Sequence, residues 1–147
     1  MNPQFGWAYP FSEGLASVRI GDEKTGKWGC IDKQGHFVIN PQFDWVQQFS
    51  EGFASVRIGD QQTGKYGYID KQGQFTVKPQ FDDGNQFSDG LAAVRIGDGK
   101  TGKWGYIDKQ GHFVVNPQFG WAQNFSEGAA AVRVGDDTTG KYGYIAR

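Results

Sequence analysis

The stretch GKWGYIDKQGHFVVNPQF, residues 102–119, predicts two short β-strands joined by a tight turn. Aromatic and apolar residues alternate with polar or small ones over 103–108 and again over 112–116, which is the period of a half-buried strand. Between them, Asp-Lys-Gln-Gly places Gly111 where a type I turn needs a left-handed residue before the chain returns as a hairpin. Almost no group in the stretch is suited to catalysis. We therefore predict a structural hairpin here rather than a catalytic site.

The same pattern recurs along the chain every 38 residues. A glycine follows a Ser-acid pair in FSEG, FSEG, FSDG and FSEG, and this spacing defines four copies of one unit. We predict a single repeat domain, 1–147, with units 3–40, 41–78, 79–116 and 117–147. The last unit stops before the equivalent of DKQGHFVV, so we expect it to lack its third strand. The invariant turn glycines are Gly14, Gly52, Gly90 and Gly128.

Each unit contains three predicted antiparallel strands, which in the first unit are 15–20, 27–32 and 36–40. Helical periodicity is absent, so the expected fold class is all-β. Both faces of these strands carry apolar residues, and a single-layer sheet in water would leave one face exposed. We therefore expect each unit to be covered by its neighbours and to depend on them for stability.

Two arrangements of four such units remain open. They could form an open superhelical stack of the β-solenoid type, or close into a four-bladed β-propeller with FDWVQQ, residues 43–48, as a short fourth strand. A unit of 38 residues is short for a four-stranded blade, which favours the open stack. An open stack with an uncapped end predicts end-to-end self-association.

Composition and charge exclude several classes of function. The chain has 15 basic and 16 acidic residues and no charged block, which argues against a nucleic-acid groove. A single cysteine, Cys30, excludes an internal disulfide framework and a multi-cysteine metal cage. The start, MNPQFGWAYP, is unlike a signal peptide, and no apolar run approaches the ~20 residues that cross a bilayer. We expect a soluble, cytoplasmic protein with no membrane or nucleic-acid partner.

A W/Y-G-Y-I-D core follows a Gly-Lys pair in each unit and precedes Lys-Gln-Gly in the first three, and it accompanies an F-S-E-G-L-A-x-V segment. This combination resembles the bacterial WG-containing repeat family, also called the WG β-repeat, over essentially the whole chain. Tyr66 and Tyr142 in place of Trp, Cys30 in place of Tyr and Ala146 in place of Asp depart from the pattern. The resemblance implies a β-repeat module of variable copy number and supplies no catalytic residues.

Two sets of repeated residues are candidates for structural roles. An aromatic residue precedes glycine in every unit, and the missing side chain beside it lets a ring or a neighbouring strand lie flat. We predict that these aromatics pack within the fold and that the turn glycines named above are likewise structural. The aromatic set is Trp28, Tyr66, Trp104 and Tyr142.

Two further sets are candidates for ligand binding. Trp7, Trp45 and Trp121 lie in the linking segments, and the third unit has Asp83 at that place, so the position is expected to be partly exposed. Exposed aromatics in a row suit a sugar or peptide surface, although packing on the strand beneath is the alternative. The invariant arginines form either a ladder to carboxylates or carbonyls between units, or an anion-binding row. They are Arg19, Arg57, Arg95 and Arg133.

We therefore expect a non-catalytic β-repeat interaction or scaffold module that binds a protein or peptide partner, with self-association through uncapped ends. The alternative is a carbohydrate-binding, lectin-like module that uses the repeated tryptophans. His36 and His112 have Gln74 at the equivalent place between them and no equivalent in the last unit, so they are not expected to form a metal site or a triad. No nucleophile with a general base is evident. No enzyme activity, metal or cofactor is expected.

Overall fold

The computed structural model describes residues 4–147 and is all-β, with four antiparallel sheets and no helix within that range. Every sheet follows the order of its strands in sequence, as a simple meander. The first contains β1 (Trp7–Ala8), β2 (Ala16–Ile20), β3 (Lys27–Ile31) and β4 (Phe37–Phe43). The second contains β5 (Trp45–Val46), β6 (Ala54–Ile58), β7 (Lys65–Ile69) and β8 (Phe75–Phe81). The third contains β9 (Asp83–Gly84), β10 (Ala92–Ile96), β11 (Lys103–Ile107) and β12 (Phe113–Phe119), and the fourth β13 (Trp121–Ala122), β14 (Ala129–Val134) and β15 (Lys141–Ala146).

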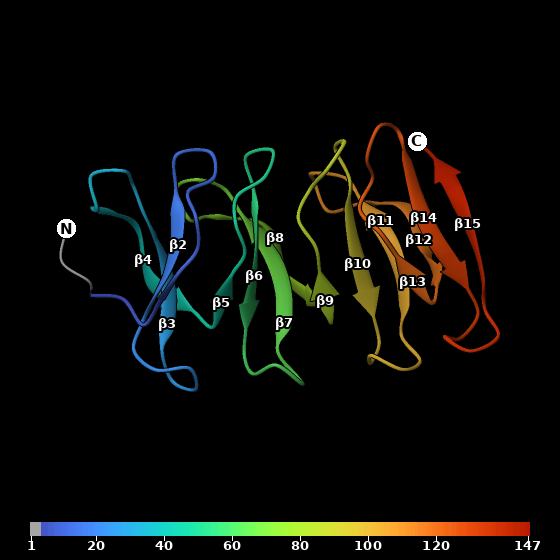
Figure 1. Ribbon diagram of the computed structural model, residues 1–147, viewed down its shortest axis with the longest axis horizontal. Coiled ribbons are helices and arrows are strands. Elements are labelled where there is room, and N and C mark those ends of the chain that lie inside the picture. The colour runs from blue at the N-terminus through green and yellow to red at the C-terminus, as the bar shows by residue number, and fades with distance from the viewer. Residues whose placement is uncertain (1–3) are drawn as a thin grey trace.

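The sheets succeed one another along the long axis of the molecule, with β1–β4 at one end and β13–β15 at the other (Figure 1). The first and last sheets do not meet, and no sheet closes into a barrel. The predicted open stack of tandem repeats is therefore confirmed, and the closed four-bladed ring is not formed. Among residues 4–147, no helix is long and apolar enough to cross a membrane.

Each sheet has one strand more than the long strands that the sequence predicts for its unit. A two-residue strand from the linking segment pairs with the first long strand, as Trp45 pairs with Arg57. The last strand of the first sheet also runs through Pro41 to Phe43, which lies opposite Trp28, so the sheet ends after the predicted unit boundary at residue 40. Proline is tolerated there because β4 is an edge strand and needs no ladder bond from that residue. The fourth sheet lacks the equivalent of β4, the strand missing from the last unit.

The glycine that follows each repeated aromatic makes room for this last strand. A Cβ atom on Gly105 would lie 2.7 Å from the backbone nitrogen of Pro117 and in hard contact with the carbonyl oxygen of Val115. Gly29 and Gly67 are enclosed in the same way. At Gly143, whose strand has no such partner within residues 4–147, no described neighbouring atom lies within 4 Å of an added Cβ. In the first three sheets the Trp-Gly or Tyr-Gly pair thus coincides with the close approach of a neighbouring backbone.

Contacts between consecutive sheets form the core. Tyr68 and Tyr106 are completely buried, and their hydroxyls donate to backbone carbonyls of the next sheet, at Asn85 and Gln123. Along one edge, the turn serines do the same, as when Ser50 Oγ donates to the Phe87 carbonyl at 2.8 Å. The apolar clusters accordingly combine residues from neighbouring sheets. One repeat completes the core of the next, as expected for units that cannot bury their own faces.

A candidate ligand-binding groove

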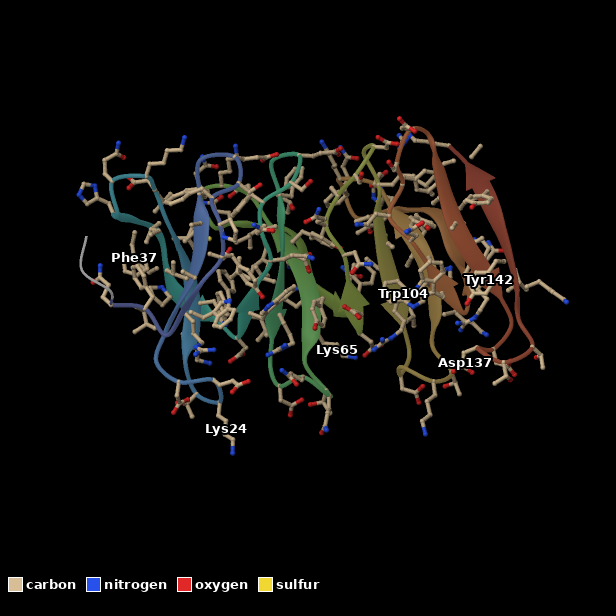
Figure 2. All side chains as sticks on the ribbon, viewed as in Figure 1. Lys24, Phe37, Lys65, Trp104, Asp137 and Tyr142 are labelled. Atoms are coloured by element: carbon tan, nitrogen blue, oxygen red, sulfur yellow. The ribbon has the colours of Figure 1, made fainter. Side chains whose placement is uncertain are left out.

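One face of each sheet carries a row of three side chains set by strand register. In the second sheet Arg57 lies between Trp45 on β5 and Tyr66 on β7, directly opposite both. Directly opposed residues on antiparallel strands project to the same face, so the three form one aromatic–arginine row. The other rows are Trp7–Arg19–Trp28, Asp83–Arg95–Trp104 and Trp121–Arg133–Tyr142. Figure 2 labels Trp104 and Tyr142, which belong to the rows of the third and fourth sheets.

The arginines of the rows hold the backbone of their own sheet. Arg57 donates from Nε to the Gly59 carbonyl at 2.9 Å and from Nη2 to the Asp44 carbonyl at 3.3 Å. The same two bonds occur in every sheet, so the guanidinium links the hairpin loop to the linking segment. The sequence predicts either a ladder of arginine bonds between units or an anion-binding row. The acceptors are backbone carbonyls, but each lies in the same unit as its arginine. Nη1 takes no part in these bonds.

The third sheet differs from the others because a carboxylate replaces tryptophan. Asp83 Oδ2 lies 3.6 Å from Arg95 Nη1, and the guanidinium of Arg95 lies over the Trp104 ring at 5.9 Å from its centroid. Within residues 4–147, no carboxylate lies within 4.0 Å of the guanidinium nitrogens of Arg19, Arg57 or Arg133. Three of the four arginines thus keep Nη1 without a charged partner among the described side chains.

A cavity of about 480 Å³ opens between the rows of the first and second sheets. Four aromatic side chains, two arginines and the residues Glu23, Asp44 and Gln61 line it. We call this cavity the aromatic groove. Its aromatic and arginine residues are Trp7, Tyr9, Trp28, Trp45, Arg19 and Arg57.

The rings of the groove are fixed to different degrees. Tyr9 stacks on Trp28, with ring centroids 5.3 Å apart and planes inclined by 22°, and Trp28 itself is buried. Trp45 meets Tyr66 edge-on at 6.1 Å and is half-buried. Trp7 is 55 % exposed. The groove therefore has three rings held by packing, Tyr9, Trp28 and Trp45, and one exposed ring, Trp7, that a ligand could cover.

Asp44, the acidic residue that lines the groove from the second sheet, already has hydrogen-bonding partners. Asp44 Oδ1 accepts from Lys27 Nζ at 2.6 Å, and Oδ2 accepts from the Gly59 N–H at 2.7 Å. Partial burial raises the pKa of Asp44, but these hydrogen bonds outweigh it and hold the pKa below its usual range. The carboxylate is thus ionised at neutral pH and paired with Lys27, which leaves Arg19 and Arg57 as the cations facing the groove.

The structure brings together four of the seven predicted ligand-binding residues and separates the rest. Trp7, Trp45, Arg19 and Arg57 line the aromatic groove, whereas Arg95 lies in the third sheet and Trp121 with Arg133 in the fourth. Of the predicted structural aromatics, Trp28 is buried but also lines the groove. Tyr142 is 66 % exposed, and within residues 4–147 no strand pairs with the outer edge of β15.

Sequence reasoning missed Tyr9, which is specific to the first repeat. The equivalent residues are Gln47, Asn85 and Gln123, so the departure of one copy from the others was the available signal. The two histidines, His36 and His112, directly precede β4 and β12, which belong to different sheets. Among the described residues, no group of three or more His, Cys, Asp and Glu side chains is placed to hold a metal ion.

Comparison with known proteins agrees with the repeat architecture. The family described as "WG containing repeat" matches residues 2–23, 28–61, 66–100 and 104–142. The chain belongs to this family. Among curated proteins, none matches the chain.

A solved chain described as "Crystal structure of the eukaryotic initiation factor" resembles this WG-repeat chain with a TM-score of 0.63 at 15 % identity. The match covers 95 % of the present chain and 39 % of the other. At that identity the likeness concerns the fold alone, and the WG-repeat chain spans well under half the length of the solved one.

Proposed function

We propose that the chain is a non-catalytic interaction module that binds an extended segment of a partner protein in the aromatic groove. The observation that carries this proposal is the groove itself, in which three tryptophans and two arginines converge from two sheets. Tryptophan and arginine dominate the binding energy of protein interfaces. Because strand register and backbone hydrogen bonds already hold most of these side chains, binding would cost little ordering entropy. The single, buried Cys30 supports a cytoplasmic setting, where thiols stay reduced.

A displayed library of random peptides tests the proposal. We expect peptides enriched on the wild-type chain to lose about tenfold or more in affinity with Trp7→Ala, since a central aromatic contact is removed. Trp121→Ala is the matched control, because Trp121 occupies the same register in the fourth sheet, outside the groove. Equal enrichment on wild type and Trp7→Ala would contradict the proposal.

Carbohydrate binding is the second candidate, and the repeated register of the tryptophans favours it. Trp7, Trp45 and Trp121 occupy equivalent places on three sheets, and such rings can stack on sugars. Asp83 interrupts this series at the third sheet, which is why we place a peptide first. A glycan array followed by tryptophan-fluorescence titration distinguishes the two. A sugar that quenches the tryptophan fluorescence of the wild type but not of Trp45→Ala would establish carbohydrate binding. If no glycan on the array binds, the second candidate is excluded.

Self-association is a further part of the proposal, because the two end faces of the stack are complementary. Inside the stack, Tyr68 donates its hydroxyl to Asn85 and meets the ring of Phe87 edge-on at 4.9 Å. At the ends, the equivalent Tyr144 is 81 % exposed and the equivalent Phe11 is 45 % exposed. These are the two halves of one repeat-to-repeat contact.

We therefore expect the first sheet of one copy to pack on the last sheet of another, as a heterologous head-to-tail scaffold. Sedimentation velocity over a range of concentrations should show assembly in the wild type. Tyr144→Glu should abolish it, whereas Val114→Glu, which changes an exposed residue on β12, should not. A wild type that stays monomeric at high concentration would contradict this part of the proposal.

A further inference from the structure

The third sheet shows which ligand group suits an arginine of these rows. There, Asp83 places its carboxylate 3.6 Å from Arg95 Nη1, while Nε and Nη2 remain bound to backbone carbonyls. The guanidinium of Arg95 keeps its two bonds to backbone carbonyls while Nη1 forms an ion pair with a carboxylate. The chain therefore contains its own example of a carboxylate bound at this position.

The first and second sheets have the same arginine in the same register without that carboxylate. Arg19 and Arg57 make the equivalent two backbone bonds, and tryptophan stands where the third sheet has aspartate. Both arginines line the aromatic groove. Within residues 4–147, no carboxylate lies within 4.0 Å of either guanidinium, so the groove leaves room for a ligand to supply one.

The other charges around the groove leave the two arginines dominant. Asp44 is bonded to Lys27 and to the backbone of Gly59. Glu23 lines the groove and offsets one positive charge. At the adjoining loops, Lys24 is cationic, and Asp60 is bonded within its own turn to residues 62 and 63. This balance suits a single carboxylate rather than a polyanion.

We propose that the aromatic groove binds an acidic side chain of an extended peptide, with the carboxylate at Nη1 of Arg19 or Arg57 and neighbouring apolar groups over Trp7 and Trp45. This inference rests on the proposed peptide-binding function and names the chemistry of the partner. A charge-assisted bond from arginine to carboxylate gives both strength and orientation. The tryptophans supply the apolar contact and shield the ion pair from water.

The test uses acetylated and amidated hexapeptides in pairs that differ only by Glu or Gln at one position flanked by leucines. Titration followed by tryptophan fluorescence should show the Glu peptide binding roughly tenfold or more tightly than its Gln twin, since a charge-assisted bond is lost. Raising the salt concentration should narrow that difference.

Trp45→Asp provides the discriminating variant, because it gives the second sheet the residue that the third sheet already has. The new carboxylate should pair with Arg57, and Trp7→Asp should do the same for Arg19. The double variant should lose the preference for Glu, with circular dichroism confirming an intact fold. Trp121→Asp makes the same change outside the groove and should leave the preference unchanged.

The outcomes separate this inference from the broader proposal. If both hexapeptides bind wild type equally, the acidic preference is wrong and peptide binding stands. If neither binds while a uronic-acid oligosaccharide does, both are overturned in favour of the carbohydrate candidate. Retention of the Glu preference in the variant that combines Trp7→Asp with Trp45→Asp would also overturn the acidic site.

Discussion

The carboxylate of Glu13 accepts a hydrogen bond from the backbone N–H of Glu51, 2.7 Å away and one repeat further along the chain. Its second oxygen accepts from the Gly52 N–H at 2.9 Å. Glu51 makes the same pair of bonds to Asp89 and Gly90 in the third sheet. Asp89 accepts one such bond, from the Gly128 N–H at 2.8 Å. The acidic side chain of one turn thus accepts hydrogen bonds from the backbone of the next turn in the first three repeats.

This relay explains a backbone conformation that glutamate rarely adopts. Glu13, Glu51, Asp89 and Glu127 all have φ near +55°, and each precedes a glycine that also has positive φ. Two successive left-handed residues form a type I′ turn, in which adjacent N–H groups can converge on one anion. The backbone strain of such a turn is offset where the carboxylate of the preceding repeat accepts hydrogen bonds from both N–H groups.

We predict that Glu51→Asn destabilises the chain by about 1–3 kcal/mol, because two charge-assisted hydrogen bonds to the next turn are lost. Asparagine tolerates the left-handed conformation, so backbone strain does not contribute. Glu127→Asn is the matched control, since the Glu127 carboxylate accepts no hydrogen bond within residues 4–147, and it should change stability by less than about 0.5 kcal/mol. Urea denaturation measures both, and equal effects would disprove the relay.

We predict that Gly105→Ala destabilises the chain by about 1–3 kcal/mol or more, because the new Cβ would collide with the backbone of β12. The same change at Gly143 meets open space and should be neutral or slightly stabilising, since alanine restricts the unfolded chain more than glycine. Urea midpoints of the two variants give the comparison. A harmless Gly105→Ala would show that the close approach of β12 is not what requires glycine.

The all-β repeat architecture could be predicted from the sequence because its determinants are local and recur four times. Alternation over 103–108, the glycine at 111 and the 38-residue period each specify a strand, a turn or a boundary without knowledge of distant contacts. The residue at which each sheet ends was harder to predict from the sequence. Proline at 41 suggested a unit boundary, whereas the edge strand continues to Phe43, because only the sheet position decides whether a missing N–H matters.

The groove could be predicted only in part. Repetition singled out Trp45 and Arg57, and strand register places them side by side. That they face Trp28 and Tyr9 of the preceding sheet depends on how consecutive sheets pack, which no local pattern encodes. Comparison between copies would have helped most, since both Tyr9 and Asp83 are departures from the repeat.

We predict that Cys30 reacts with Ellman's reagent at pH 8 at least about a hundredfold more slowly than a free cysteine, because only the thiolate attacks. Burial raises the pKa of the Cys30 thiol to about 11, and the nearby Ser17 hydroxyl offsets only part of that rise. In concentrated urea the reaction should become fast, which is the control. Rapid modification of the native chain would show that the interface between the first two sheets opens readily.

We predict that stability falls as the pH is lowered from about 5 to about 2, through the carboxylates that accept backbone hydrogen bonds. Hydrogen bonds from Thr139, together with those from Thr138, lower the pKa of Asp136 to about 2. Partial burial raises the pKa of Glu13, but the bonds from Gly52 and Glu51 outweigh it and leave the pKa below its usual range.

The sign follows from the order of the pKa values. Each folded-state pKa lies below the unfolded one, so the stabilisation is complete above the unfolded pKa and is lost as the pH falls through the folded value. Urea midpoints at successive pH values should decline in this window and stay nearly level from about pH 6 to 7. Asp136→Asn should reduce the decline, because amide replaces the titrating group, and the two chains should converge in stability at low pH. A midpoint that rises on acidification would contradict the assignment, because these carboxylates would then be better stabilised in the unfolded chain.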